Sequence, residues 1–263
     1  MKRTKNPAKE AEYRKRAADL VAQMTLHEKV SQMLSWAPAI ERLGIPAYNW
    51  WSEGIHGVGR AGTATVFPQA IGMAAAFDED MMEQVGNAIG VEARGKYNMC
   101  RAHGDRDIFK GLTVWAPNIN IFRDPRWGRG HETYGEDPFL TSRLGVRFVE
   151  GMQGDDPDYL QAAACAKHFA VHSGPESDRH HFNAIVSKQD LWETYLPAFR
   201  ALVKEAGVEA VMGAYNRTNG EPCCGSKTLL KDILRDKWHF DGHVTSDLSL
   251  IHISEPTRPL YIS

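Results

Sequence analysis

The stretch "AAACAKHFAVHSG", residues 162–174, decides the fold. Its first half is small and apolar, as a buried strand is, and polar side chains follow it at once. The same order recurs in "NINIFRDPRWGRG" (118–130), "GAYNRTNG" (213–220) and "VTSD" (244–247). Polar groups gathered after strand ends are typical of the catalytic face of a (β/α)8 barrel.

Helical patterns alternate with these apolar runs along the chain. Apolar runs at 45–51, 69–77, 112–122, 162–171, 208–216 and 242–247 are separated by helical patterns at 79–98, 138–152, 188–206 and 226–238. Strands separated by helices of this length predict βαβ units and a parallel sheet. A doubly wound sheet is the rival, but no G-x-G-x-x-G turn follows the first strand. We therefore expect an α/β fold of TIM-barrel type.

The N-terminal segment is expected to be helical. Residues 8–34 carry apolar side chains at helical spacing, and Thr25 with Glu28 forms a capping-box pattern that starts a second helix.

Composition excludes several classes of partner and places the chain among globular proteins. Its 263 residues are 43% hydrophobic, and 31 basic against 33 acidic residues give a net charge of −2. That balance gives no electrostatic reason to expect nucleic acid or an anionic membrane. No apolar run approaches the roughly 18 residues of a membrane span, and no signal-peptide core is visible. We expect a cytoplasmic protein with four reduced cysteines; a secreted or periplasmic location is the alternative.

Four long motifs carry a family resemblance. They are "YNWWSEGIHGVGRAGTATVFPQAIGMAAAFD", "APNINIFRDPRWGRGHETYGEDP", "AAACAKHFAVHSGPESDRH" and "VMGAYNRTNGEPCC". In this order they resemble the N-terminal barrel domain of glycoside hydrolase family 3, in its β-xylosidase and β-glucosidase members. The resemblance runs from about residue 15 to Asp247. It implies a cofactor-free retaining exo-glycosidase that removes single sugars from β-linked oligosaccharides or aryl glycosides, on an incomplete (β/α)8 barrel reaching about strand seven.

The resemblance assigns the nucleophile to Asp247. Retaining hydrolysis needs a carboxylate at the anomeric carbon and a second acid about 5–5.5 Å away. Asp247 in "GHVTSD" matches the family's nucleophile, at the tip of a strand. From the pattern alone, an N-cap for a following helix is an open alternative.

Six further residues match the family's first sugar subsite: Glu53, Arg129, Lys167, His168, Arg179 and Tyr215. Glu53 stands where many relatives carry Asp, and its greater length favours a sugar without a hydroxymethyl group, such as xylose. The charged residues around Arg129 are expected to form a salt-bridged loop: Arg123, Asp124, Arg126, Glu132 and Asp137. Without the resemblance, Lys167 and His168 would be interpreted as a surface lysine and a satisfied core histidine.

The same residues also allow two other chemistries. His168 and His172 are four apart, which is zinc spacing on a helix, but here they lie on a predicted strand and loop, so no metal site is expected. Lys167 is the candidate for Schiff-base chemistry in an unrelated aldolase-type barrel.

The last residues raise a separate question. "LSLIHISEPTR" reads as a translated transposase-type sequencing adapter, so we expect residues 1–247 to be the barrel domain and 248–263 not to be native. The family's general acid comes from outside the barrel core, usually on a further C-terminal domain. The sequence therefore predicts that this chain by itself is inactive; a catalytically dead sugar-binding fragment is the alternative.

Overall fold

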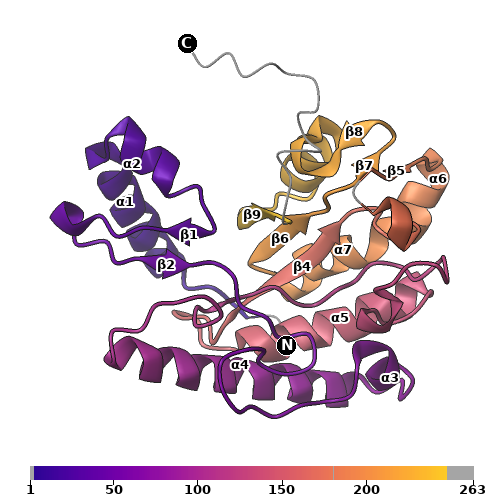
Figure 1. The fold of residues 1–263 in the computed structure, drawn as a ribbon, viewed down its shortest axis with the longest axis horizontal. Coiled ribbons are helices and arrows are strands. Elements are labelled where there is room, and N and C mark those ends of the chain that lie inside the picture. Colours follow the sequence, from indigo (N-terminus) through magenta and orange to yellow (C-terminus); the bar gives the residue numbers. More distant parts are fainter. Residues whose placement is uncertain (1–2, 180, 248–263) are drawn as a thin grey trace.

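A parallel sheet of four strands forms the centre of the structure, a computed structural model that describes residues 3–179 and 181–247. The strands lie in the order β3 (Thr113–Val114), β4 (Ala163–Phe169), β6 (Ala210–Gly213) and β9 (His243–Ser246), and every neighbouring pair is parallel. Ser52 pairs with Val114 in parallel, which extends the array beyond β3. The sheet is open and curved, as half of a barrel (Figure 1).

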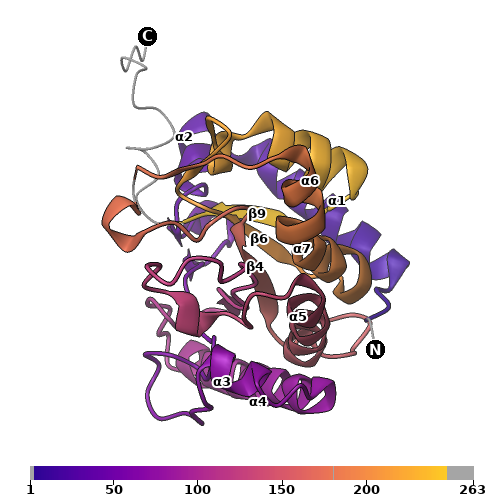
Figure 2. The ribbon, with the colours of Figure 1, turned by 90° about the vertical axis from the view of Figure 1, so that its right-hand side faces the viewer.

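Helices cover the outer face of this sheet. The long helices α4 (Glu79–Ala102) and α5 (Pro138–Gln153) lie side by side below it, and Figure 2 shows them from the side. A continuous helical stretch joins β4 to β6 and comprises α6 (Lys188–Asp190), η4 (Leu191–Tyr195), α7 (Pro197–Ala201) and η5 (Leu202–Ala206). The helix η7 (Lys227–Lys237) joins β6 to β9. Six of the seven β4 residues are buried, because helices cover one face and the barrel interior the other.

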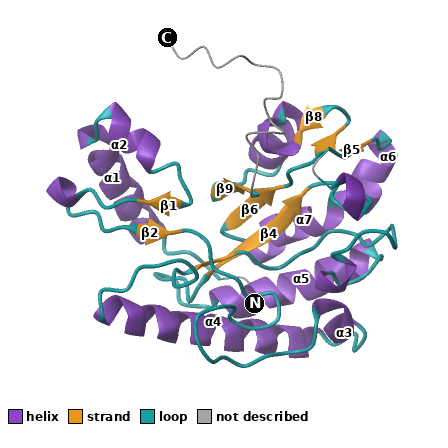
Figure 3. Cartoon of the chain, viewed as in Figure 1, coloured by secondary structure: helices purple, strands orange, loops and turns teal. Residues whose placement is uncertain are grey.

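The N-terminal elements form a separate arm beside the sheet (Figure 3). It comprises α1 (Pro7–Gln23), α2 (Leu26–Ser31), η1 (Glu41–Leu43) and the antiparallel pair β1 (Trp36–Ala37) and β2 (Tyr48–Asn49). The capping box predicted at Thr25 and Glu28 is confirmed, with both reciprocal hydrogen bonds present. Neither α1 nor α2 has a buried residue.

Short elements complete the fold around the strand ends. They are α3 (Ala70–Ala74), η2 (Gly130–Glu132), η3 (Glu176–Asp178), η6 (Cys223–Gly225) and a small sheet of β5 (Asn183–Ala184), β7 (Arg217–Thr218) and β8 (Glu221–Pro222). None of the helices in the described part of the chain has the length and apolar character needed to cross a membrane.

The predicted α/β fold, an incomplete barrel with preceding helices, is confirmed as a half-barrel, and two segments differ from their predicted form. The apolar run 69–77 forms the helix α3 instead of a strand, since Ala70, Met73 and Ala74 share one buried face. The run 45–51 pairs antiparallel with β1, so the described parallel sheet has four strands where about seven were expected. Residues 248–263, expected to be non-native, lie outside the described residues.

Candidate active site

The site is built at the carboxyl ends of β4, β6 and β9. Asp247 directly follows β9, and its backbone N–H donates to the carbonyl oxygen of Gly213 at the end of β6 (3.2 Å). This bond continues the sheet by one residue and holds the Asp247 backbone against the neighbouring strand. Asp247 is 9% exposed to solvent. The strand-end position predicted for this carboxylate is therefore the one it occupies.

His168 links Asp247 to the loop that follows β3. Its Nε2 atom lies 3.6 Å from Asp247 Oδ2 and 3.1 Å from Arg129 Nη1. Burial, reinforced by the positive charge of Arg129, lowers the pKa of His168 well below its ordinary value. The imidazole is thus neutral at physiological pH, so its approach to Asp247 is a contact of two polar groups and not an ion pair.

Arg129 is fixed by Glu132. Its Nε and Nη2 atoms donate to the two carboxylate oxygens of Glu132 at 2.7 and 2.6 Å, in a bidentate pair. Burial alone would raise the pKa of Glu132, because it favours the neutral acid. The hydrogen bonds and the charge of Arg129 outweigh this effect, so the pKa of Glu132 is lowered. The positive charge of Arg129 also acts on Asp247.

Two of the salt bridges predicted in the loop around Arg129 are present. Arg126 binds Asp124, and Arg129 binds Glu132. Arg123 instead donates to Ser173 Oγ (3.0 Å). The remaining carboxylate, at position 137, accepts from the backbone N–H of Leu140 and is the N-cap of α5.

Lys167 and Glu53 form a second polar pair beside this group. Lys167 is 3% exposed, and its Nζ lies 3.6 Å from Glu53 Oε2. Glu53 Oε1 accepts a hydrogen bond from the indole N–H of Trp51 (2.7 Å), and the Trp51 ring stacks on Trp115. An ammonium buried to this degree needs an anionic partner, which Glu53 supplies. The indole at position 51 is thus engaged in holding Glu53.

Arg179 and Tyr215 are in direct contact beside Asp247. Arg179 Nε donates to the Tyr215 hydroxyl, and its guanidinium carbon lies 5.2 Å above the ring centroid. Burial raises the pKa of Tyr215, and the negative charge of Asp247 raises it further. The tyrosine therefore stays a neutral phenol close to the carboxylate.

The structure brings all seven predicted residues into one cluster. Three other members are Asn120, His172 and Asn216, all buried. Sequence reasoning considered His172 only as a possible metal ligand and missed both asparagines, whose only signal is a position within a few residues of a strand end. Within the described residues there is no group of three or more His, Cys, Asp or Glu side chains that could hold a metal ion.

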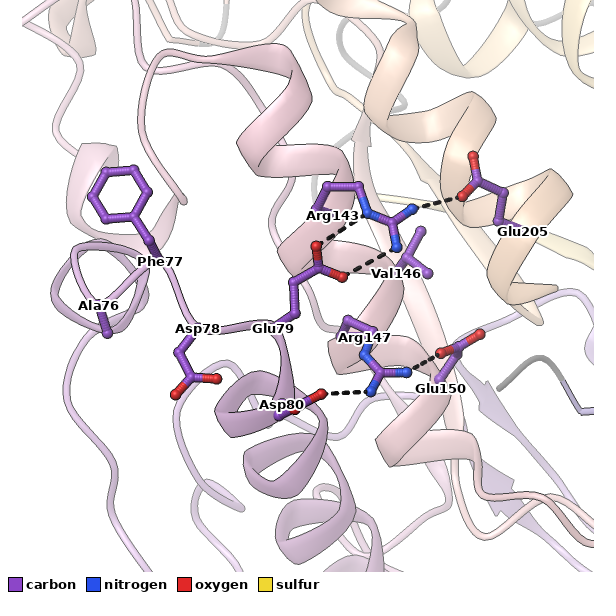
Figure 4. Close-up of a pocket in the computed structure, with 10 residues that line it drawn as sticks. All are labelled: Ala76, Phe77, Asp78, Glu79, Asp80, Arg143, Val146, Arg147, Glu150 and Glu205. Carbon is purple, nitrogen blue, oxygen red and sulfur yellow. Dashed lines mark hydrogen bonds and ion pairs between the residues drawn. The ribbon is translucent and has the colours of Figure 1, made fainter.

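A hollow of the described surface lies elsewhere. It has a volume of about 700 Å³ and lies where the start of α4 meets α5 (Figure 4). Arg143 binds Glu79 and Glu205 there, and Arg147 binds Asp80 and Glu150. It shares no residue with the strand-end cluster, and its charges are paired with one another, so we assign the chemistry to the cluster.

Comparisons with known proteins identify one family. The model of the glycosyl hydrolase family 3 N-terminal domain matches residues 16–259. A xylan 1,4-beta-xylosidase of Xylanibacter ruminicola is 51% identical over 242 residues, which are 90% of this chain and 28% of the relative. A probable beta-D-xylosidase 7 of Arabidopsis thaliana is 47% identical over 91% of this chain and 33% of its own length.

Solved structures show the same architecture. A family 3 exo-beta-xylosidase in complex with a xylobiose aziridine probe superposes with a TM-score of 0.84 at 36% identity, over 90% of this chain and 32% of that one. A Bifidobacterium adolescentis beta-glucosidase gives 0.74 at 33% identity, over 86% and 32%. The chain spans about a third of the length of these relatives.

The half-barrel and these matches together place the chain among α/β glycoside hydrolase domains. The chain belongs to glycoside hydrolase family 3 and contains its N-terminal domain.

Proposed function

We propose that this domain forms the nucleophile half of a retaining exo-β-xylosidase site, with Asp247 as the nucleophile. The observation that carries the proposal is the placement of Asp247 at the end of β9, beside His168 and within the field of Arg129. A carboxylate on a strand end is held rigidly, as attack on an anomeric carbon requires. Arg129 supplies positive charge next to it.

The first sugar subsite would be formed by the groups around Asp247. Lys167, Arg129 and Arg179 offer N–H donors, and Glu53 offers a carboxylate acceptor. A sugar ring presents hydroxyl groups that accept from the former and donate to the latter. The hydrolase relatives named above are mostly xylosidases, which supports a xylose-type sugar.

The general acid is expected from outside the described residues. Glu53, Glu132 and Glu176 are described carboxylates that contact the cluster, and each is paired with a cation. A general acid must be protonated before it acts. Glu132 fails this requirement because its two bonds to Arg129 lower its pKa. We therefore expect this chain to turn over unactivated xylosides negligibly.

A substrate that needs no acid tests the nucleophile directly. A dinitrophenyl leaving group departs without protonation, and fluorine at the sugar's second carbon slows hydrolysis of the glycosyl-enzyme. Incubation of the 263-residue chain with dinitrophenyl 2-fluoro-β-xyloside should add one fluoroxylosyl group, which peptide mapping should place on Asp247. Asp247→Asn should abolish the adduct. Asp241→Asn, which removes an exposed carboxylate that pairs with Arg14, should not.

Three outcomes would contradict parts of the proposal. An adduct on any other residue would defeat the assignment of the nucleophile. Xyloside binding with no adduct in the native chain would favour a sugar-binding fragment without catalysis. Rapid hydrolysis of xylobiose by this chain would instead show that it contains its own acid.

A further inference from the structure

Two histidines with matching asparagines lie at the centre of the site. The rings of His168 and His172 are 4.7 Å apart between centroids, and they meet edge to face. Nδ1 of each faces the side-chain oxygen of an asparagine, Asn120 for His168 (3.0 Å) and Asn216 for His172 (3.1 Å). All four side chains are buried, at 1–3% exposure. The repetition indicates a constraint on both rings.

The orientation of the Asn120 amide is determined by its neighbours. Its Nδ2 lies 2.8 Å from the carbonyl oxygen of His168 and 3.2 Å from that of Ala170, and carbonyl oxygens only accept. Its Oδ1 receives the backbone N–H of His168 (2.8 Å), which only donates. The amide therefore cannot be reversed. Since Oδ1 is only an acceptor, His168 Nδ1 must carry the proton.

The other nitrogen of His168 leads to the same result independently. Nε2 lies 3.1 Å from Arg129 Nη1, and a guanidinium only donates. Nε2 must therefore be the bare nitrogen with its lone pair toward Arg129. One nitrogen must hold a proton and the other must lack one, so the ring is neutral in a single tautomer.

The second pair follows the same logic. Asn216 Nδ2 donates to the carbonyl oxygens of Val171 and Arg217, both at 2.8 Å, which leaves Oδ1 to accept from His172 Nδ1. Nε2 of His172 is buried and has no hydrogen-bond partner among the described residues. His172 is thus also held with its proton on Nδ1.

We propose that Asn120 is a positioning residue that locks His168 in the Nδ1–H tautomer, so that His168 orients Arg129 and leaves Asp247 undisturbed. With the proton on Nε2, the N–H of His168 would oppose the N–H of Arg129 and would point toward Asp247 Oδ2, 3.6 Å away. A small movement would then let this N–H bind the lone pairs that attack the sugar. Asn216 imposes the same tautomer on His172.

The hydrogen bond between Arg129 and His168 also limits how many N–H donors Arg129 can present to a sugar. Arg129 has five N–H groups, and three are used on Glu132 and His168. At most two remain for sugar hydroxyls. The role of Arg129 and Asp247 in this inference rests on the proposed function, whereas the tautomer itself does not.

Long-range proton–nitrogen NMR of the chain labelled with nitrogen-15 histidine tests the tautomer without any sugar. The His168 signals are assigned by their loss in His168→Gln. We expect Nδ1 at the shift of a protonated nitrogen and Nε2 at that of a bare one, unchanged from about pH 7.5 to 5.5, where a free histidine titrates. A protonated Nε2 in the native chain would overturn the proposal.

Two variants separate positioning from mere structure. Asn120→Ala should give His168 a mixed tautomer and leave the His172 signals unchanged; Asn216→Ala should do the reverse. Should Asn120→Ala fail to fold, Asn120→Asp has the same size and should raise the pKa of His168 by placing a carboxylate at Nδ1. Unchanged His168 signals in the folded variant would refute the role of Asn120.

The rate of labelling gives the functional readout. A mixed tautomer of His168 weakens the hydrogen bond that its Nε2 accepts from the charged Arg129. Loss of this bond should slow fluoroxylosyl transfer in Asn120→Ala by about tenfold or more. Equal rates in native and variant chains would refute the effect on Asp247 and Arg129. If no chain is labelled while the NMR signals behave as expected, the proposed function fails and the tautomer assignment stands.

Discussion

Mild acid should destabilise this protein well above the range in which carboxylates titrate. Burial lowers the pKa of His172 to about 3, and burial together with the charge of Arg129 lowers the pKa of His168 well below its ordinary value. Both remain neutral in the folded protein at pH 5.5. In the unfolded chain each titrates near pH 6.5. The unfolded state therefore binds more protons, and stability falls as the pH falls.

The magnitude follows from proton linkage. Between pH 7.5 and 5.5, a histidine that is neutral when folded and titrates near 6.5 when unfolded costs about 1.4 kcal/mol. His168 and His172 together should therefore cost about 3 kcal/mol. His243, whose pKa burial lowers to about 4, acts in the same direction. A loss of this size is a large part of the roughly 5–15 kcal/mol of a typical domain.

Urea unfolding at the two pH values measures the effect. Glu28 and Asp124 have pKa values lowered to about 2, so their stabilisation is lost below this window. Glu209, whose pKa burial raises, acts in the opposite sense, because its folded form binds a proton more readily. His172→Asn keeps an N–H near Asn216 but cannot titrate, and should reduce the loss by about 1.4 kcal/mol. Equal free energies of unfolding at pH 7.5 and 5.5 in the native chain would refute the reasoning.

Two further predictions concern packing and sugar choice. Gly151→Ala should destabilise the protein by about 1–3 kcal/mol, because the added Cβ would collide with the backbone carbonyl of Glu83 where α5 meets α4. The control Gly95→Ala, on the open side of α4, should be neutral or stabilising by up to about 1 kcal/mol. Thermal unfolding compares the two variants, and equal shifts in melting temperature would contradict the close contact at Gly151. Glu53→Asp shortens the acceptor beside Lys167 and should raise the labelling rate by the glucose-type relative to the xylose-type fluoroglycoside; an unchanged ratio would show that Glu53 does not select the sugar.

The clustering of the seven candidate site residues was predictable from sequence. Each lies in a motif within or just after an apolar run, and in parallel strands the carboxyl ends meet at one edge, so residues far apart in the chain must converge there. The resemblance then favoured a nucleophile over a helix cap as the prediction for Asp247. Asn120 and Asn216 could not be found in this way. An asparagine near a strand end is common, and its role depends on which acceptor and donor atoms fold back around its amide.

The sequence by itself determined the α/β class, the alternation of helices and strands after residue 78, the capping box at Thr25 and the family, because these depend on local spacing and on motifs. Only the tertiary structure decided that the run 69–77 is a helix, that Arg129 is clamped by Glu132, and that His168 is neutral in one tautomer. The physical reason is that protonation states and hydrogen-bond directions are set by burial and by neighbours brought from other elements, which periodicity along one chain does not encode.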